Sequence, residues 1–202
     1  MTALVMAGGK GSRMGGPVEK PLLEISGESM LEHVVKVLKS CQSIERVVIA
    51  STRNTPTTSM KAEKFGVESV ITPGEGFESD MRFAIHNLSL RDVLVISADL
   101  PFLTVGVIED AARKYRKAGK PALAVMAPVE LYDTLGLKPT YVFETNGREL
   151  VPVGINILDG KRIDEGTLDE AQLIVESGDL TFNVNTPGEL AAARKRVAKG
   201  KR

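Results

Sequence analysis

The sequence predicts an α/β protein with a mostly parallel, mixed sheet that carries helices on both faces. Two observations lead to this fold class. Continuous apolar runs of strand length recur along the chain, and segments with the apolar spacing of a helix lie between most of them. This alternation is typical of parallel sheets, because helical connections cover both faces and bury the strands between them. The length of 202 residues suits one such unit, so we expect residues 1–202 to form a single domain.

The expected strands are mostly continuous apolar runs, which indicates that they are buried on both faces of the sheet. The strongest run is Val93–Ile96, and Pro152 and Gly154 interrupt a later one. In chain order, we expect strands at 3–7, 46–51, 67–72, 93–96, 122–126, 150–158 and 180–184.

Helix signals fall between these runs. Ser29 and Glu32 have the spacing of a capping box, in which the hydroxyl accepts a backbone N–H at the start of a helix. Further helices are expected from about Ser79 and over 104–118. Pro187 is expected to start the last helix, because the first helical position tolerates the missing N–H of proline. The turn-rich segment 128–150 receives no element.

Composition and charge exclude several classes of protein. The 26 Lys+Arg balance the 26 Asp+Glu, which argues against a strongly basic nucleic-acid binder. A single cysteine, Cys41, excludes an intramolecular disulfide framework and favours a reducing compartment. No apolar run approaches the roughly 18–20 residues that a membrane-spanning helix needs. We therefore expect a cytoplasmic protein that neither binds nucleic acid nor spans a membrane.

The most informative segment is the loop after the first expected strand. Residues 7–16 read Ala-Gly-Gly-Lys-Gly-Ser-Arg-Met-Gly-Gly. Glycines let a backbone approach a ligand closely, and successive N–H groups in such a loop form a concavity that binds anions. Lys10, Arg13 and Lys20 add positive charge within a few residues. The loop is therefore expected to bind a polyanion such as a triphosphate.

Two common phosphate-binding motifs do not fit this loop. A dinucleotide fingerprint that uses Gly9 and Gly11 requires a third glycine where Met14 stands. A Walker loop that starts at Gly11 requires Gly-Lys where the chain has Gly16 and Pro17. The first mismatch disfavours an enzyme of hydride transfer.

Three segments together resemble the nucleotidyltransferases with a Rossmann-like, GT-A-like fold. Residues 7–15 fit the pattern A-G-G-x-x-x-R-M-G, and K-P-L follows at 20–22. Residues 99–102 resemble the metal-binding step D-x-P-F, and 183–190 resemble the closing segment N-x-N-T-P-x-E-L. The resemblance implies transfer of a nucleoside monophosphate from an NTP to a phosphate acceptor.

A narrower resemblance, over residues 123–126, 150–156 and 182–186, is to the archaeal-type adenosylcobinamide-phosphate guanylyltransferases. It implies transfer of GMP from GTP to adenosylcobinamide phosphate, a corrinoid, with release of pyrophosphate. Two alternatives remain open. The acceptor could be molybdopterin or another phosphate, as in the molybdenum-cofactor guanylyltransferases, or the chain could bind a nucleotide without catalysing transfer.

The expected catalytic residues are Lys20, Arg13 and Asp99. Lys10 and Arg13 would hold the β- and γ-phosphates of GTP, and Lys20 would stabilise the α-phosphate in the transition state. The remaining expected GTP-binding positions either offer backbone N–H groups in the loop or lie at the edge of the sheet. These positions are Gly8, Gly9, Gly11, Ser12, Gly76, Ser97 and Ala98.

The resemblance also implies a metal site and an acceptor site. Asp99 and Asn185 would bind Mg²⁺, which prefers oxygen ligands. Alternatively, Asp99 caps the following helix and Asn185 forms a turn. Gly154 and Asn156 would face the second substrate, although Gly154 could instead mark a β-bulge.

Further predictions are less specific. Glu75 or Glu78 could read guanine, and Tyr132, Tyr141 and Phe143 could cover the corrinoid. We expect a monomer or a homodimer.

Overall fold

The computed structural model describes residues 1–139 and 141–200. Its centre is an eight-stranded sheet with the order β10-β7-β9-β6-β1-β4-β5, in which β8 pairs with β9. Strand β9 runs antiparallel to β6, β7 and β8, and the other neighbours are parallel. The expected mixed, mostly parallel sheet is therefore confirmed. Its strands are β1 Thr2–Met6, β4 Arg46–Ser51, β5 Glu68–Ile71, β6 Asp92–Ser97, β7 Ala122–Pro128, β8 Phe143–Thr145, β9 Arg148–Asp159 and β10 Glu170–Ile174.

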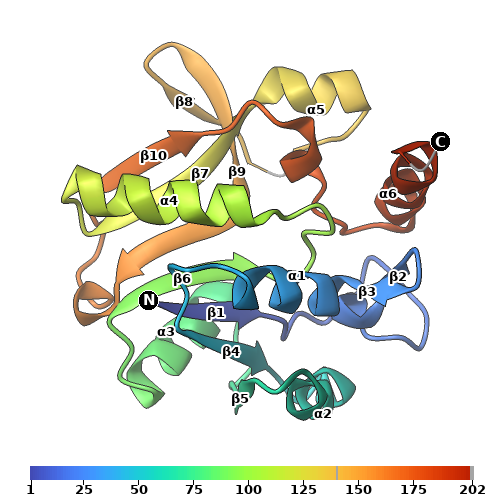
Figure 1. Cartoon of the computed structure of the whole chain (residues 1–202), viewed down its shortest axis with the longest axis horizontal. Coiled ribbons are helices and arrows are strands. Elements are labelled where there is room, and N and C mark those ends of the chain that lie inside the picture. Colours follow the sequence, from blue (N-terminus) through green and yellow to red (C-terminus); the bar gives the residue numbers. More distant parts are fainter. Residues whose placement is uncertain (140, 201–202) are drawn as a thin grey trace.

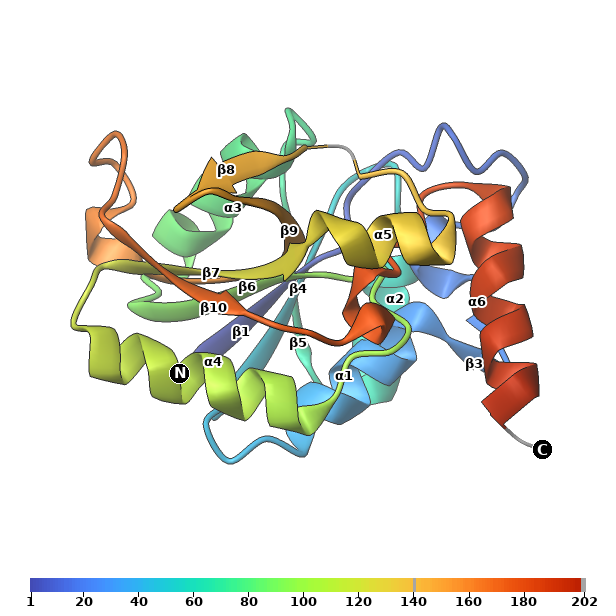
Figure 2. The same cartoon turned by 90° about the horizontal axis from the view of Figure 1, so that it is seen from above.

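Helices cover both faces of the sheet, as Figures 1 and 2 show. They are α1 Met30–Lys39, α2 Pro56–Phe65, α3 Phe77–Asn87, α4 Val105–Ala118, α5 Val129–Leu135 and α6 Pro187–Gly200. A small hairpin, β2 Glu24–Ile25 and β3 Glu28–Ser29, precedes α1, and 3-10 turns lie at η1 Lys20–Leu22, η2 Gly160–Arg162 and η3 Gly178–Thr181. No helix in the described part of the chain is long and apolar enough to span a membrane.

The core is divided by the sheet. Ala3 and Val5 of β1 pack with α1 and α4 on one face, whereas Leu4 packs with α3 on the other. This alternation follows from the strand geometry, because successive side chains point to opposite faces. Both layers of side chains are buried, which is why β1 reads as a continuous apolar run.

The first expected helix begins where the capping box predicts. Ser29 is the N-cap of α1, and its hydroxyl accepts the backbone N–H of Glu32 at 3.2 Å. The hydrogen bond satisfies one of the backbone donors that the first turn leaves free. Most expected strands and helices likewise coincide with observed ones to within a few residues.

The strand expected at 180–184 is wrong. The segment is buried, but Gly178–Thr181 forms the turn η3, and Phe182 and Val184 pack with α6 in a separate cluster beside Ile25 and Met30. The apolar run reflects burial rather than sheet pairing. The last strand is instead β10, an edge strand in which Ala171 is the only buried residue and Glu170 and Gln172 interrupt the apolar side chains. Helix α2, helix α5 and strand β8 also occur in segments left without an element.

Candidate active site

A cavity of about 550 Å³ opens where β1, β4 and β6 end. Met6, Ala50 and Ser97, the last or near-last residues of these strands, line it. Parallel strands present their carboxyl ends at one sheet edge, which is where open α/β sheets bind ligands. The volume lies within the roughly 300–1,000 Å³ of small-molecule sites. It has room for a nucleoside triphosphate.

The glycine loop forms one wall of this cavity. Gly8, Gly9 and Lys10 line it. The carbonyl oxygen of Gly8 accepts a hydrogen bond from the Thr52 hydroxyl at 2.8 Å, and a Cβ at Gly8 would lie 2.4 Å from Thr52 Cγ2. A contact that short is sterically impossible, so the loop can pass β4 this closely only with glycine at position 8.

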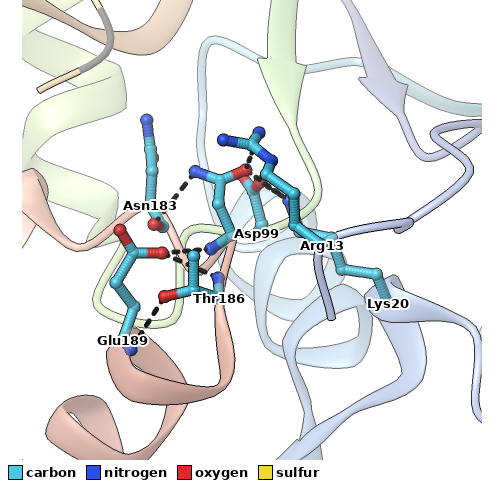
Figure 3. A network of polar contacts seen from close by, with 7 residues as sticks. Arg13, Lys20, Asp99, Asn183, Thr186 and Glu189 are labelled. Carbon is cyan, nitrogen blue, oxygen red and sulfur yellow. Dashed lines mark hydrogen bonds and ion pairs between the residues drawn. The ribbon is translucent and has the colours of Figure 1, made fainter. Parts of the chain in front are cut away.

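Lys20, Asp99 and Asn185 meet at the cavity wall. Figure 3 shows Lys20 and Asp99 within this network of polar contacts. The Lys20 ammonium forms a salt bridge with Asp99 Oδ2 and donates to Asn185 Oδ1 at 2.8 Å. The side chains of Lys20 and Asp99 are only 16% and 14% exposed. The Arg13 guanidinium donates to the same Asn185 oxygen over a longer 3.4 Å. The tertiary structure thus brings the expected catalytic and metal-binding residues into one cluster.

Asn185 is oriented by the start of α6. The Glu189 carboxylate accepts the backbone N–H groups of Asn185 and Thr186 at 2.6 and 2.8 Å, while the Thr186 hydroxyl accepts the N–H of Glu189 at 3.3 Å. Asn185 Nδ2 also donates to the Asn183 carbonyl at 3.1 Å. The amide is therefore fixed with Oδ1 toward Lys20. The Thr186–Glu189 spacing is a capping-box signal that could have predicted this support from sequence.

Glu19, the neighbour of Lys20, ties this segment of chain to α2 and was not among the expected site residues. The Glu19 carboxylate accepts the backbone N–H groups of Thr57 and Thr58, each at 2.7 Å, in the first turn of α2. Burial raises the pKa of Glu19, but the hydrogen bonds from Thr58 and Thr57 outweigh it and hold this pKa below its ordinary value. Glu19 was missed because α2 itself was not predicted.

The donor set at Asp99 fits a divalent cation. Asp99 Oδ1 is buried and has no hydrogen-bond partner within the described residues. A free carboxylate oxygen and an amide oxygen are the ligands that Mg²⁺ takes when substrate phosphates and water complete its coordination. No group of three or more His, Cys, Asp or Glu residues in the described ranges could form an all-protein cage. The alternative that Asp99 caps a helix is wrong, since Thr104 is the N-cap of α4.

Other expected GTP-binding positions divide into two groups. Gly76, Ser97 and Ala98 line the cavity. Gly11, Ser12 and Arg13 are not among the residues that line it, and Ser12 and Arg13 are exposed beside its loop wall.

The two expected acceptor positions lie along β9. Gly154 has a φ of +80° and stands where the register between β7 and β9 shifts, so the bulge alternative is observed. A Cβ at Gly154 would lie 3.2 Å from the Ser97 hydroxyl, so Gly154 adjoins the cavity wall. Asn156 pairs with Val95 and Ala124 inside the sheet and is not among the lining residues.

The less specific predictions have mixed outcomes. Tyr132 is buried in the core, where burial raises the pKa of its phenol to about 12, so it cannot cover a substrate. Tyr141 and Phe143 are exposed: Phe143 is the first residue of β8, and Tyr141 lies two positions before it. Glu75 lines the cavity, whereas Glu78 pairs with Arg82 at 3.1 Å and is not among the lining residues.

The structure adds cavity residues that the sequence analysis missed. They follow β4 and β5, and they are Asn54, Thr72, Gly74, Phe77 and Asp80. Asn54 and Thr72 stand in segments without a glycine-rich or charged pattern, whereas Gly74, Phe77 and Asp80 lie in the run 74–80, from which only Gly76, Glu75 and Glu78 were expected at the site. The sheet order shows that both segments share a cavity with the loop.

Comparison with known proteins places the chain in a family. The MobA-like NTP transferase domain matches residues 3–151. The adenosylcobinamide-phosphate guanylyltransferase of Methanocaldococcus jannaschii is 36% identical, and the alignment covers 98% of each chain. A probable molybdenum cofactor guanylyltransferase of Thermococcus gammatolerans is 24% identical over 96% of this chain and 100% of that protein.

Solved structures share the fold. The molybdopterin-guanine dinucleotide biosynthesis protein A of Archaeoglobus fulgidus superposes with a TM-score of 0.68 at 20% identity, covering 98% of this chain and 100% of that one. A CMP:2-keto-3-deoxy-manno-octonic acid synthetase complexed with CTP superposes with a TM-score of 0.75 at 16% identity, covering 98% of each chain. The GT-A-like fold that the sequence resemblance implied is therefore confirmed. The chain belongs to the MobA-like NTP transferase family and is a nucleotidyltransferase.

Proposed function

We propose that this enzyme transfers GMP from GTP to adenosylcobinamide phosphate, forming adenosylcobinamide-GDP and pyrophosphate. The observation that carries the proposal is the Lys20–Asp99–Asn185 cluster on the wall of a cavity with room for a nucleoside triphosphate. The likeness to the M. jannaschii guanylyltransferase, which extends over nearly the whole of both chains, supports the choice of GTP and of a corrinoid phosphate.

The reaction requires alignment and charge neutralisation rather than a protein nucleophile. An oxygen of the acceptor phosphate attacks the α-phosphorus, and the bond from that phosphorus to the bridging oxygen breaks, so the β- and γ-phosphates leave as pyrophosphate. Two anions must approach each other, which favours cations along their path. Lys10, Arg13 and the N–H groups of residues 8–12 would hold the leaving phosphates. Lys20 would neutralise charge that develops at the α-phosphate.

The Lys20 ammonium is placed to serve this role. It is shared between Asp99 and Asn185, and the phosphates of GTP would compete for the same donor. Asp99 and Asn185 would then hold Mg²⁺ with phosphate oxygens, and that ion supplies additional neutralisation of phosphate charge when bound. The buried, unbonded Asp99 Oδ1 supports this assignment within the described residues.

The acceptor would approach from the side of β9. Gly154 of β9 adjoins Ser97 at the cavity wall. Strand β8, which pairs with β9, begins with the exposed ring of Phe143, and the exposed ring of Tyr141 lies two positions before it. Exposed apolar side chains beside a polar site suit an acceptor that is both bulky and phosphorylated.

The test is to incubate the enzyme with GTP and each candidate acceptor and to measure pyrophosphate release. We expect turnover with adenosylcobinamide phosphate. If the enzyme turns over only with molybdopterin, the acceptor is molybdopterin and not the corrinoid phosphate. If it binds GTP but transfers GMP to no acceptor, it is a non-catalytic nucleotide-binding protein.

A further inference from the structure

The carboxylate of Asp80 lines the cavity and keeps free acceptor capacity. Asp80 lies in the first turn of α3 and is only 6% exposed. Its Oδ1 accepts the backbone N–H of Gly74 at 2.8 Å. Within residues 1–139 and 141–200 that N–H is the one donor to the carboxylate, although a carboxylate can accept about four hydrogen bonds. Oδ2 has no partner among these residues and is not one of the fully buried unpaired oxygens, so it faces space that a ligand can enter.

The neighbouring charges do not satisfy Asp80. Glu75 accepts from the Ser79 hydroxyl at 3.2 Å, and Glu78 pairs with Arg82. No lysine or arginine of the described residues forms a salt bridge with Asp80. The acid is therefore available to a ligand inside the cavity.

The sheet order separates Asp80 from the Lys20–Asp99 pair. Gly74, to which Asp80 is bonded, follows β5, whereas Asp99 follows β6, and β4 and β1 lie between these strands. Three strand spacings correspond to about 14 Å. The cavity thus has the Lys20–Asp99 pair at its β6 end and an acceptor, Asp80, at its β5 end. The glycine loop lies between these ends, since Gly8 and Gly74 both lie against Thr52. A nucleotide whose α-phosphate meets Lys20 would present its base toward α3.

We propose that Asp80 determines base specificity by accepting hydrogen bonds from the N1–H and the 2-amino group of guanine. Guanine presents two adjacent donors on one edge, which match a carboxylate. Adenine and cytosine pair one amino group with an acceptor, and uracil has a single N–H between two carbonyls. The half-exposed ring of Phe77, which also lines the cavity, can pack against the base. This inference rests on the proposed function, since it assumes that GTP is the donor.

The substitution Asp80→Asn tests this role with little change in shape. The amide oxygen can still accept the N–H of Gly74, but one acceptor becomes an NH₂ donor. That donor repels the 2-amino group of guanine and matches the carbonyl that xanthine carries at the same position. We expect GTP affinity to fall by about tenfold to a hundredfold and affinity for XTP to rise, measured by calorimetry on the whole chain. Glu78→Gln, on the same helical turn but outside the cavity, is the matched control and should leave both affinities unchanged.

A second comparison needs no variant. The unaltered enzyme should bind ITP, which lacks only the 2-amino group, at least about tenfold more weakly than GTP. If the unaltered enzyme prefers GTP but Asp80→Asn leaves the GTP-to-XTP ratio unchanged, Asp80 only anchors the loop and this inference fails alone. Equal binding of ITP and GTP would likewise overturn it. If the unaltered enzyme prefers ATP or CTP, the proposed function fails as well.

Discussion

Replacing Glu19 tests whether helix α2 positions Lys20. Glu19 accepts two backbone N–H groups of α2 at 2.7 Å each, and the residue that follows it carries the ammonium that contacts Asp99 and Asn185. Hydrogen bonds to a charged group contribute about 1.5–3 kcal/mol each. Because Glu19 is half-buried, solvent screening reduces this, and we take about 1 kcal/mol for each bond. Glu19→Ala should therefore destabilise the fold by about 2 kcal/mol, and Glu19→Gln, which keeps one acceptor, by about half as much.

Thermal unfolding and kinetics together measure this effect. In a chain of this size, each kcal/mol shifts Tm by about 2–4 °C, so Glu19→Ala should lower Tm by about 4–8 °C. Because Lys20 loses its support, kcat should fall more than KM for GTP rises, which a purely structural role would not produce. Glu63→Gln, on the exposed side of the same helix, is the control.

The pH dependence gives an independent check. The folded-state pKa of Glu19 lies below its ordinary value of 4.5, so its contribution to stability is present above that value and is lost as pH falls through the folded pKa. The Tm difference between the unaltered enzyme and Glu19→Gln should shrink over that acidic range. A Glu19→Ala variant with unaltered Tm and kcat would refute the reasoning.

Three further outcomes are expected. Lys20→Ala and Asp99→Ala should each lower kcat by about 10²–10³ while some GTP affinity remains, as shown by pyrophosphate release and calorimetry; transfer at the unaltered rate would exclude these roles. Gly8→Ala should destabilise the fold by about 1–3 kcal/mol, because the added Cβ would lie 2.4 Å from Thr52 Cγ2. Adding Thr52→Ser removes that methyl group but keeps the hydroxyl that bonds Gly8, so it should restore Tm, and no restoration would locate the strain elsewhere. Cys41, whose thiol pKa burial raises to about 11, should not react with a thiol reagent at pH 8 unless the protein is unfolded, which a colorimetric assay checks.

Local chemistry made several elements predictable. The continuous apolar runs identify β1, β4 and β6, because burial on both faces leaves no polar positions along a strand. The spacing of Ser29 and Glu32 identifies the first turn of α1, because the cap is a contact between residues three apart. Glycines and cations in the loop likewise indicate an anion site without any knowledge of the fold.

Burial without pairing was the source of the main error. Residues 180–184 alternate apolar and polar side chains as a strand can, yet Phe182 and Val184 pack beneath α6, while β10, whose apolar residues are interrupted by Gln172, takes the edge of the sheet beside β7. A hydrophobic pattern reports that a segment leaves water, but it does not report which partner covers it.

The sequence by itself determined the strand-and-helix alternation, the anion-binding loop and the family to which they belong, since each is written within short stretches of chain. Only the tertiary structure decided which distant side chains share the cavity: Lys20 meets Asp99 and Asn185 across 79 and 165 positions, and Asp80 enters from α3. The physical reason is that strand order follows from the packing of the whole sheet. A local pattern predicts whether a strand is buried, but it does not predict which strands lie beside it.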